Sequence, residues 1–204
     1  MTSAVAVIDP VLLEAARRTL RKHGYENMTA ERIALEAGIS RMTLHRRGIR
    51  REDLLAGLAQ IAVQAYRDAL WPSLVSDADG AQRLRTALNA LCAVAEEHLD
   101  VLIALQASSD AVFHEDGADD QAPVETRSPF VEPLERLLRD GAADGTVRAV
   151  ADPHETATVL FNAAGWTYIH LRQGHRFAPA QARSALLDLL LGGLLPPDRS
   201  AAPK

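Results

Sequence analysis

Residues 29–51 constrain the fold of this 204-residue chain more than any other stretch. Two short helices are predicted there, because Thr29 and Ser40 can each cap a helix start and Gly38 supplies the left-handed residue that ends the first helix. Residues 37–51 hold five arginines and no acidic residue. A helix, a turn with glycine and a short basic helix are typical of a helix-turn-helix, whose second helix lies in a DNA major groove. On spacing alone, an ordinary helix pair with solvated arginines stays open as the alternative.

A wider set of residues in and around this stretch favours the helix-turn-helix over an ordinary helix pair. They are Gly24-Tyr25, Thr29, Ile33-Ala34, Ala37-Gly38-Ile39-Ser40, Thr43-Leu44, Glu52-Asp53 and Leu54-Leu55. In this register they resemble the N-terminal domain of the TetR (tetracycline-repressor-like) family of transcription regulators. The resemblance extends weakly over the rest of the chain, but only about the first 55 residues carry specific motifs.

The chain departs from the family pattern at three positions. His45 stands where the family has tyrosine, Gly48 where it has phenylalanine, and Arg51 where it has lysine. Gly48 has a physical role of its own, since glycine ends a helix at low cost and Ile49 can then fold back onto Leu44. The lost aromatic also motivates an alternative function, a helical small-molecule binding protein that has lost operator binding.

Composition favours an all-α protein, because leucine and alanine dominate and aromatic residues make up only 4%. Capping residues and apolar spacing along the chain indicate about nine helices. The net charge of −5 divides unevenly, with +3 on residues 1–55 and −8 on residues 56–204. This asymmetry indicates a basic contact head on an acidic body. We therefore predict a helix-turn-helix DNA-binding domain over residues 1–50 and a helical effector-binding and dimerisation domain over residues 51–204.

Helix boundaries follow from capping residues and apolar spacing. The first helix is expected from Pro10 to about His23, and one from residue 51 or 52 to about Pro72 links head and body. Later helices are predicted from about residue 81 to 97, over 101–113 with Asp100 as cap, over 130–140, from Pro153, and over 179–195. The last two helices are apolar on more than one face, which predicts burial against a partner subunit. The alternative is a central helix in a monomer.

Sequence signatures of catalysis are missing. No histidine has a glutamate three residues before it, and no HExxH, phosphate-binding loop, dinucleotide fingerprint or GxSxG occurs. We expect no enzyme activity, no metal and no cofactor. The chain shows no signal peptide, and its longest apolar run, residues 185–195, is too short to span a bilayer. A cytoplasmic protein without a membrane partner is expected.

The residues expected to contact double-stranded DNA lie in or beside the two short helices. They are Thr29, Arg41, Met42, Thr43, His45, Arg46, Arg47 and Arg51. The resemblance implies that Arg41, Met42, Thr43 and His45 meet base edges or nearby phosphates. Arg41 is the favoured base reader because arginine pairing with guanine is the commonest specific contact. The other arginines and Thr29 are expected to reach phosphates.

The resemblance also implies a regulator that responds to a small molecule. It implies a homodimer through the last two helices, a repressor that binds a palindromic operator, and an unknown effector bound in the body. Side chains expected to face such an effector are Trp71, His98, Leu102, Gln106, Phe113, Phe130, Leu134, Trp166 and His170. Ordinary core packing stays open as the alternative for each of them. On binding, the effector would change the spacing of the two heads through the helix that begins at residue 51.

Overall fold

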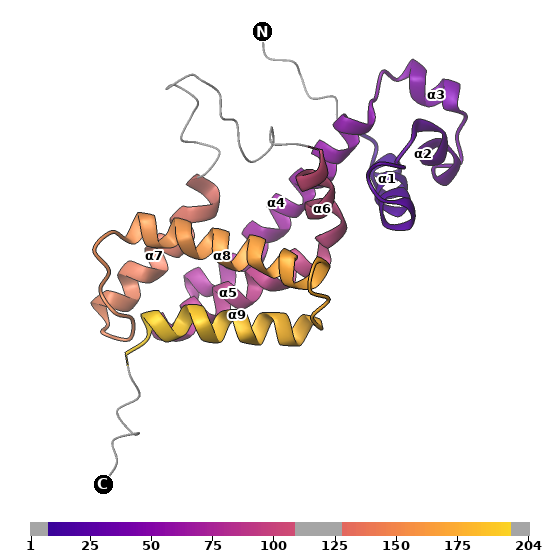
Figure 1. Cartoon of the computed structure of the whole chain (residues 1–204). Coiled ribbons are helices and arrows are strands. Elements are labelled where there is room, and N and C mark those ends of the chain that lie inside the picture. Colours follow the sequence, from indigo (N-terminus) through magenta and orange to yellow (C-terminus); the bar gives the residue numbers. More distant parts are fainter. Residues whose placement is uncertain (1–7, 109–127, 197–204) are drawn as a thin grey trace, which may run out of the picture. The chain divides into compact units, whose positions relative to one another are not determined.

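The computed structural model describes residues 8–108 and 128–196, and every regular element within those ranges is an α-helix (Figure 1). The helices are α1 (Pro10–His23), α2 (Ala30–Glu36), α3 (Arg41–Arg46), α4 (Arg51–Val75), α5 (Gly80–Glu97), α6 (Leu99–Ala107), α7 (Ser128–Ala143), α8 (Pro153–Gln173) and α9 (Pro179–Leu194). The all-α prediction is confirmed. The described residues form two compact units, which we call the head unit (8–64 with 98–108) and the body unit (65–97 with 128–196).

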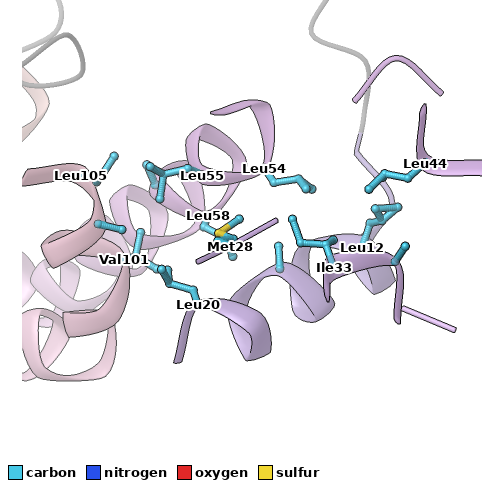
Figure 2. Close-up of a cluster of buried hydrophobic side chains, with 14 residues drawn as sticks. Leu12, Leu20, Met28, Ile33, Leu44, Leu54, Leu55, Leu58, Val101 and Leu105 are labelled. Atoms are coloured by element: carbon cyan, nitrogen blue, oxygen red, sulfur yellow. The ribbon is translucent and has the colours of Figure 1, made fainter. Parts of the chain in front are cut away.

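The head unit is held by one apolar core (Figure 2). Its largest buried side chains are Leu12, Leu20, Met28, Ile33, Leu44, Leu54, Leu55, Leu58, Val101 and Leu105. Most of these residues come from α1, α2, α3, the first half of α4 and α6. The predicted start of α1 is confirmed, since Asp9 accepts a hydrogen bond from the Val11 amide at 2.9 Å and Pro10 opens the helix. The compact unit thus includes α6 and residues 51–64 in addition to residues of the predicted head.

The prediction that Asp100 caps a helix was wrong. The cap position of α6 is His98, and Asp100 lies in the first turn of the helix. Its carboxylate instead lies 2.9 Å from Nε of Arg21 and 3.6 Å from Nε of Arg17, both on α1. A tertiary ion pair therefore uses the acid that sequence reasoning had assigned to a local cap. The predicted extent was also wrong, because α6 ends at Ala107 with Ser108 at its C-cap position, before the predicted end at residue 113, which itself lies outside the described residues.

In the body unit, α8 packs against α5, α7 and α9. The predicted start of α8 is confirmed, because the Asp152 carboxylate accepts from the amides of His154 (2.8 Å) and Glu155 (3.0 Å). Farther along, the Glu96 carboxylate of α5 accepts from Tyr168 at 2.9 Å and from Arg172 at 2.6 and 2.8 Å. These bonds, above all those from Arg172, lower the pKa of Glu96 and fix α8 to α5.

α4 is longer than predicted. It continues through Pro72 to Val75, where sequence reasoning had ended it near residue 72. The proline removes one amide donor, but the carbonyl groups of the last turn find a partner elsewhere in the body unit. Nε of Arg83 donates to the Ser73 carbonyl at 2.9 Å, and Nη2 donates to that of Leu74 at 3.2 Å. α7 also exceeds its predicted range of 130–140 at both ends.

A close approach of two glycines joins α5 to α7. A Cβ added at Gly80 would lie 2.2 Å from the Cα of Gly141, so only glycine fits there. The approach lets the loop after α7 cap α5. The Gly80 amide donates to the Asp144 carboxylate at 2.7 Å, and the Ala81 amide donates to the Thr146 hydroxyl at 2.9 Å. Hydrogen bonds from Thr146 and from the Gly80 amide also lower the pKa of Asp144.

Replacing Gly80 with alanine should therefore destabilise the chain by about 2 kcal/mol or more, because the added methyl collides with backbone that cannot move alone. Gly165 of α8 is the matched control, since a Cβ there meets nothing within 4 Å. Gly165→Ala should be neutral or stabilising by up to about 1 kcal/mol. Chemical denaturation of the two variants and the wild type measures this. Equal stability of Gly80→Ala and wild type would contradict the packing described.

Candidate nucleic-acid interface

α2 and α3 are joined by a tightly hydrogen-bonded turn. Gly38 has a φ of +67° and donates to the Leu35 carbonyl at 3.2 Å, while the Ile39 amide donates to the Ala34 carbonyl at 3.0 Å. These are the two bonds of a Schellman closure. The next residue, Ser40, accepts the Thr43 amide through its hydroxyl at 3.1 Å and so starts α3. The predicted helix, glycine turn and second helix are confirmed.

The α2 helix also begins where the sequence indicated. The Thr29 hydroxyl accepts a hydrogen bond from the Arg32 amide at 3.4 Å, and the Thr29 side chain is exposed. Glu31 lies in the first turn, where a negative charge suits the helix dipole. Thr29 is therefore placed at the amide end of α2, as an anion contact would require.

α3 has a single buried anchor. Leu44 is only 2% exposed, whereas Arg41, Met42, His45 and Arg46 are exposed. A helix of six residues is too short to be stable alone, so the burial of Leu44 fixes its orientation. Four of the residues predicted to contact DNA are thus brought together on the solvent side of α3. Thr43 is half-buried, and its hydroxyl is hydrogen-bonded to that of Ser40 at 2.9 Å.

The predicted end of α3 is confirmed. Gly48 has a φ of +66°, and its amide donates to the His45 carbonyl at 3.0 Å. Ile49 is half-buried against the head core, which contains Leu44. The side chain that follows the glycine therefore occupies core space near the place where the family has an aromatic residue.

Carboxylates accompany most arginines of this surface. Nη1 of Arg41 lies 2.8 Å from Oε1 of Glu31, and Nη1 of Arg47 lies 3.7 Å from Oδ2 of Asp9. By contrast, Arg46 makes no ion pair with any carboxylate of residues 8–108 or 128–196. Among the described residues, the Arg46 guanidinium therefore has no carboxylate to compete with another anion, unlike that of Arg41.

The two arginines at the start of α4 are paired locally. Arg50 lies 3.4 Å from the Asp53 carboxylate, and Arg51 lies 3.0 Å from that of Glu52. The guanidinium of Arg51 also stacks 4.6 Å above the Tyr25 ring. Hydrogen bonds at the helix start and from these arginines lower the pKa of Asp53 and of Glu52.

Sequence reasoning treated this surface as basic and missed its acidic partners. Glu52 and Asp53 could have been found, because they directly follow the two arginines they bind. Glu31 and Asp9 could not be paired with arginines by spacing, since the fold alone brings them to α3 and to the residue after it.

The predicted effector residues are spread over both units. In the head unit His98 is buried, Leu102 is half-buried and Gln106 is exposed; in the body unit Leu134 is buried, Phe130 and Trp166 are half-buried, and Trp71 and His170 are exposed. Phe113 lies outside the described residues. Their role in binding an effector stays a prediction.

An aromatic cluster surrounds Phe130 in the body unit. Its ring lies 5.5 Å from that of Tyr66 and 5.3 Å from that of Phe161, measured between centroids. The Tyr66 hydroxyl donates to the Phe130 carbonyl at 2.8 Å, and burial raises the pKa of this tyrosine. Neither Tyr66 nor Phe161 was predicted as a site residue. Tyr66 sits in the apolar spacing of α4, where a core residue and a ligand contact look alike.

Other kinds of site have little support. Within residues 8–108 and 128–196, no three histidine, cysteine or acidic side chains gather as a metal site would require. No helix in those ranges is both long and apolar enough to cross a bilayer. A shallow groove of about 370 Å³ in the body unit is lined by Arg85, Arg148, Asp188 and residues at and just after the end of α9, none of which was predicted as a site residue.

A capped helix, a glycine-ended turn and a short helix with a basic exposed face place the chain in the helix-turn-helix class. Comparison with protein families then gives two matches. Residues 12–58 match "Bacterial regulatory proteins, tetR family", and residues 77–194 match "Tetracyclin repressor-like, C-terminal domain". The chain belongs to the TetR family of transcriptional regulators. No curated protein matches it in sequence.

Solved structures share the fold over nearly the whole chain. A protein of unknown function from Rhodococcus sp. RHA1 is 24% identical, with a TM-score of 0.66 over 91% of this chain and 94% of its own. PfmR, a TetR family transcriptional regulator from Thermus thermophilus, is 22% identical, with a TM-score of 0.66 over 90% and 98%. FadR from Bacillus subtilis, solved in complex with stearoyl-CoA, is 16% identical, with a TM-score of 0.65 over 90% and 97%.

Replacing Gly48 with alanine should cost about 1 kcal/mol or more of stability, because an L side chain is strained in the left-handed conformation. A Cβ at this site would meet nothing within 4 Å, so the cost comes from the backbone alone. Gly48→Asn is the control and should lose less, since asparagine tolerates this conformation. Urea unfolding monitored by circular dichroism measures both. Alanine and asparagine variants of equal stability would rule out this account of the helix end.

Proposed function

We propose that this chain is a homodimeric, ligand-responsive repressor that binds a palindromic DNA operator in the cytoplasm. The observation that carries the proposal is the exposed face of α3. This face carries Arg41, Met42, His45 and Arg46, and buried Leu44 holds the helix from the opposite side. Such a face fits a major groove, which admits one α-helix. Both matching regions belong to a family of transcriptional regulators, which supports a role in the control of transcription.

We assign the side chains of this surface to two groups, those that contact base edges and those that contact phosphates. Arg41 is the first residue of α3 and is proposed to read a base edge, with Met42, Thr43 and His45 beside it. Arg46, Arg47 and Arg51 are proposed to bind phosphates, which set register and orientation on the duplex. Thr29, exposed at the amide end of α2, is proposed as a further phosphate contact.

The proposed dimer interface lies on α8 and α9. Val159 of α8 is 59% exposed and Leu189 of α9 is 76% exposed, although both are apolar. Two exposed apolar side chains on adjacent helices support burial against a second copy of the chain. Leu189 is therefore the position chosen for a test of this interface.

The proposed effector is a small molecule bound by the body unit. FadR, which shares the fold, was crystallised with stearoyl-CoA, and this supports a ligand in the body of the present chain without naming it. The half-buried rings of Phe130 and Phe161 offer apolar surface of the kind that ligand sites use. We propose that the effector changes the spacing of the two heads through α4, which continues from the head unit into the body unit.

A gel-shift experiment with fragments flanking the chain's own gene tests operator binding. The proposed function expects a retarded complex that competitor operator removes and that unrelated DNA does not. The second candidate, a small-molecule binding protein without operator, was motivated by the missing aromatic at Gly48. It expects no retarded complex with any fragment, together with ligand-dependent thermal stabilisation of the isolated chain.

Leu189→Glu should give monomers with unchanged helix content, because a charge at a buried two-fold interface faces its own copy. Sedimentation equilibrium at micromolar concentration measures the mass, and far-ultraviolet circular dichroism checks the fold. Gln181→Glu, an exposed position on the same helix, is the control for added charge. The interface proposal fails if the wild-type chain is already monomeric under these conditions.

Arg46→Ala should reduce the salt dependence of operator binding, because each neutralised phosphate releases about one counterion. The slope of log affinity against log salt should fall by roughly two units per dimer, one for each subunit. Arg136→Ala, on an exposed position of the body unit, should leave the slope unchanged. Fluorescence anisotropy across a salt series gives both slopes. An unchanged slope for Arg46→Ala would remove this side chain from the phosphate contacts.

A further inference from the structure

One ion pair of the head unit joins the two helices of the helix-turn-helix directly. Oε1 of Glu31, in the first turn of α2, lies 2.8 Å from Nη1 of Arg41, the first residue of α3. The other ion pairs formed by arginines near α3 do not join α2 to α3. Those of Arg50 and Arg51 use acids at the start of α4, next to them in the chain, and the pair of Arg47 is longer, at 3.7 Å.

The environment of this carboxylate favours its ionised form. Hydrogen bonding from its own backbone amide, the charge of Arg41 and a hydrogen bond with the Thr29 side chain lower the pKa of Glu31, in that order of size. The group is therefore ionised at neutral pH, at the amide end of α2 where a negative charge is favoured. Glu31 offers a charged acceptor to the arginine across the turn.

Arg41 needs such an acceptor. Its guanidinium is at the amide end of α3, the end of a helix that disfavours a cation. Its side chain is 70% exposed and has many rotamers available. The bond to Glu31 uses Nη1, and no other residue in the described parts of the chain binds Nε or Nη2, which leaves these two donors as a pair. Two parallel donors are what the O6 and N7 atoms of guanine require.

We propose that Glu31 is a specificity-determining positioning residue, which holds Arg41 for base reading and weakens its attraction to phosphates. The inference rests on the proposed operator binding. Its physical basis is that the carboxylate limits the directions in which the guanidinium can point. The same negative charge, close to the DNA, opposes binding that depends on phosphates alone. Glu31 therefore raises the ratio of specific to non-specific affinity in two ways. It favours base reading by Arg41 and disfavours binding to phosphates alone.

The experiment begins with selection of binding sites from random duplex DNA by the wild-type chain. Anisotropy titrations then compare wild type, Glu31→Gln, Arg41→Ala and the double variant. The duplexes are the selected site, an unrelated duplex, and the selected site changed at the base pair that Arg41→Ala no longer distinguishes. Glutamine keeps the size of the side chain and one acceptor oxygen but carries no charge. Glu14→Gln, which neutralises an exposed α1 acid bonded to Arg18, is the matched control.

Glu31→Gln should lose discrimination at that base pair by about fivefold, near the upper limit for an exposed ion pair. Its affinity for the unrelated duplex should rise, with a steeper salt dependence than wild type. In the Arg41→Ala background the same change should leave discrimination unaltered, since the group being positioned is gone. The Glu14→Gln variant should show wild-type discrimination.

Three results would overturn the inference. The first is wild-type discrimination by Glu31→Gln. The second is an equal loss of affinity for all three duplexes, which would mean a merely structural role and would accompany a lower unfolding midpoint. The third is a base-pair preference that Arg41→Ala leaves intact at every position. If the wild-type chain enriches no sequence at all, the proposed operator binding fails first, and this inference falls with it.

Discussion

The burial of Leu44 is the contact on which the orientation of α3 depends. The helix that carries it has six residues, which is below the length at which a helix persists in water. Its ends are therefore set by local chemistry, with the Ser40 cap at one end and Gly48 at the other. Its direction is set by a core to which α1, α2, α4 and α6 all contribute. The head unit can be understood as the support that turns one face of α3 to the solvent.

The charges on that face are arranged in pairs rather than left free. Arg41, Arg47 and Arg51 each meet a carboxylate, whereas Arg46 meets none within the described parts of the chain. Exposed ion pairs contribute little to stability. In the proposed DNA complex, a phosphate would compete with a carboxylate that is already in place. The proposed surface would then favour sites where several contacts form together over DNA met at random.

Local chemistry could be predicted from the sequence, and tertiary chemistry could not. The caps at Asp9, Ser40 and Asp152 and the glycine ends of α2 and α3 follow from residue type and spacing, and the structure confirms them. α4 extends past Pro72, and its last carbonyl groups accept hydrogen bonds from Arg83 of α5. This contact between two helices could not be read from the spacing within either one. Asp100 failed as a cap because α1 supplies two arginines for it. The effector residues could not be predicted securely, because apolar periodicity does not distinguish a side chain that faces a ligand from one that packs in the core.

The most direct test is amide chemical-shift mapping of the nitrogen-15-labelled chain during titration with a duplex that it selects from random sequence. The account predicts that the largest shifts fall on residues 29–51, with the amides of Arg41 and His45 among them and with smaller changes beyond residue 64. A ligand-binding protein without operator would show no saturable shifts in this range. Shifts confined to α8 and α9, with the α3 amides unmoved, would contradict the claim that α3 is the surface that meets DNA.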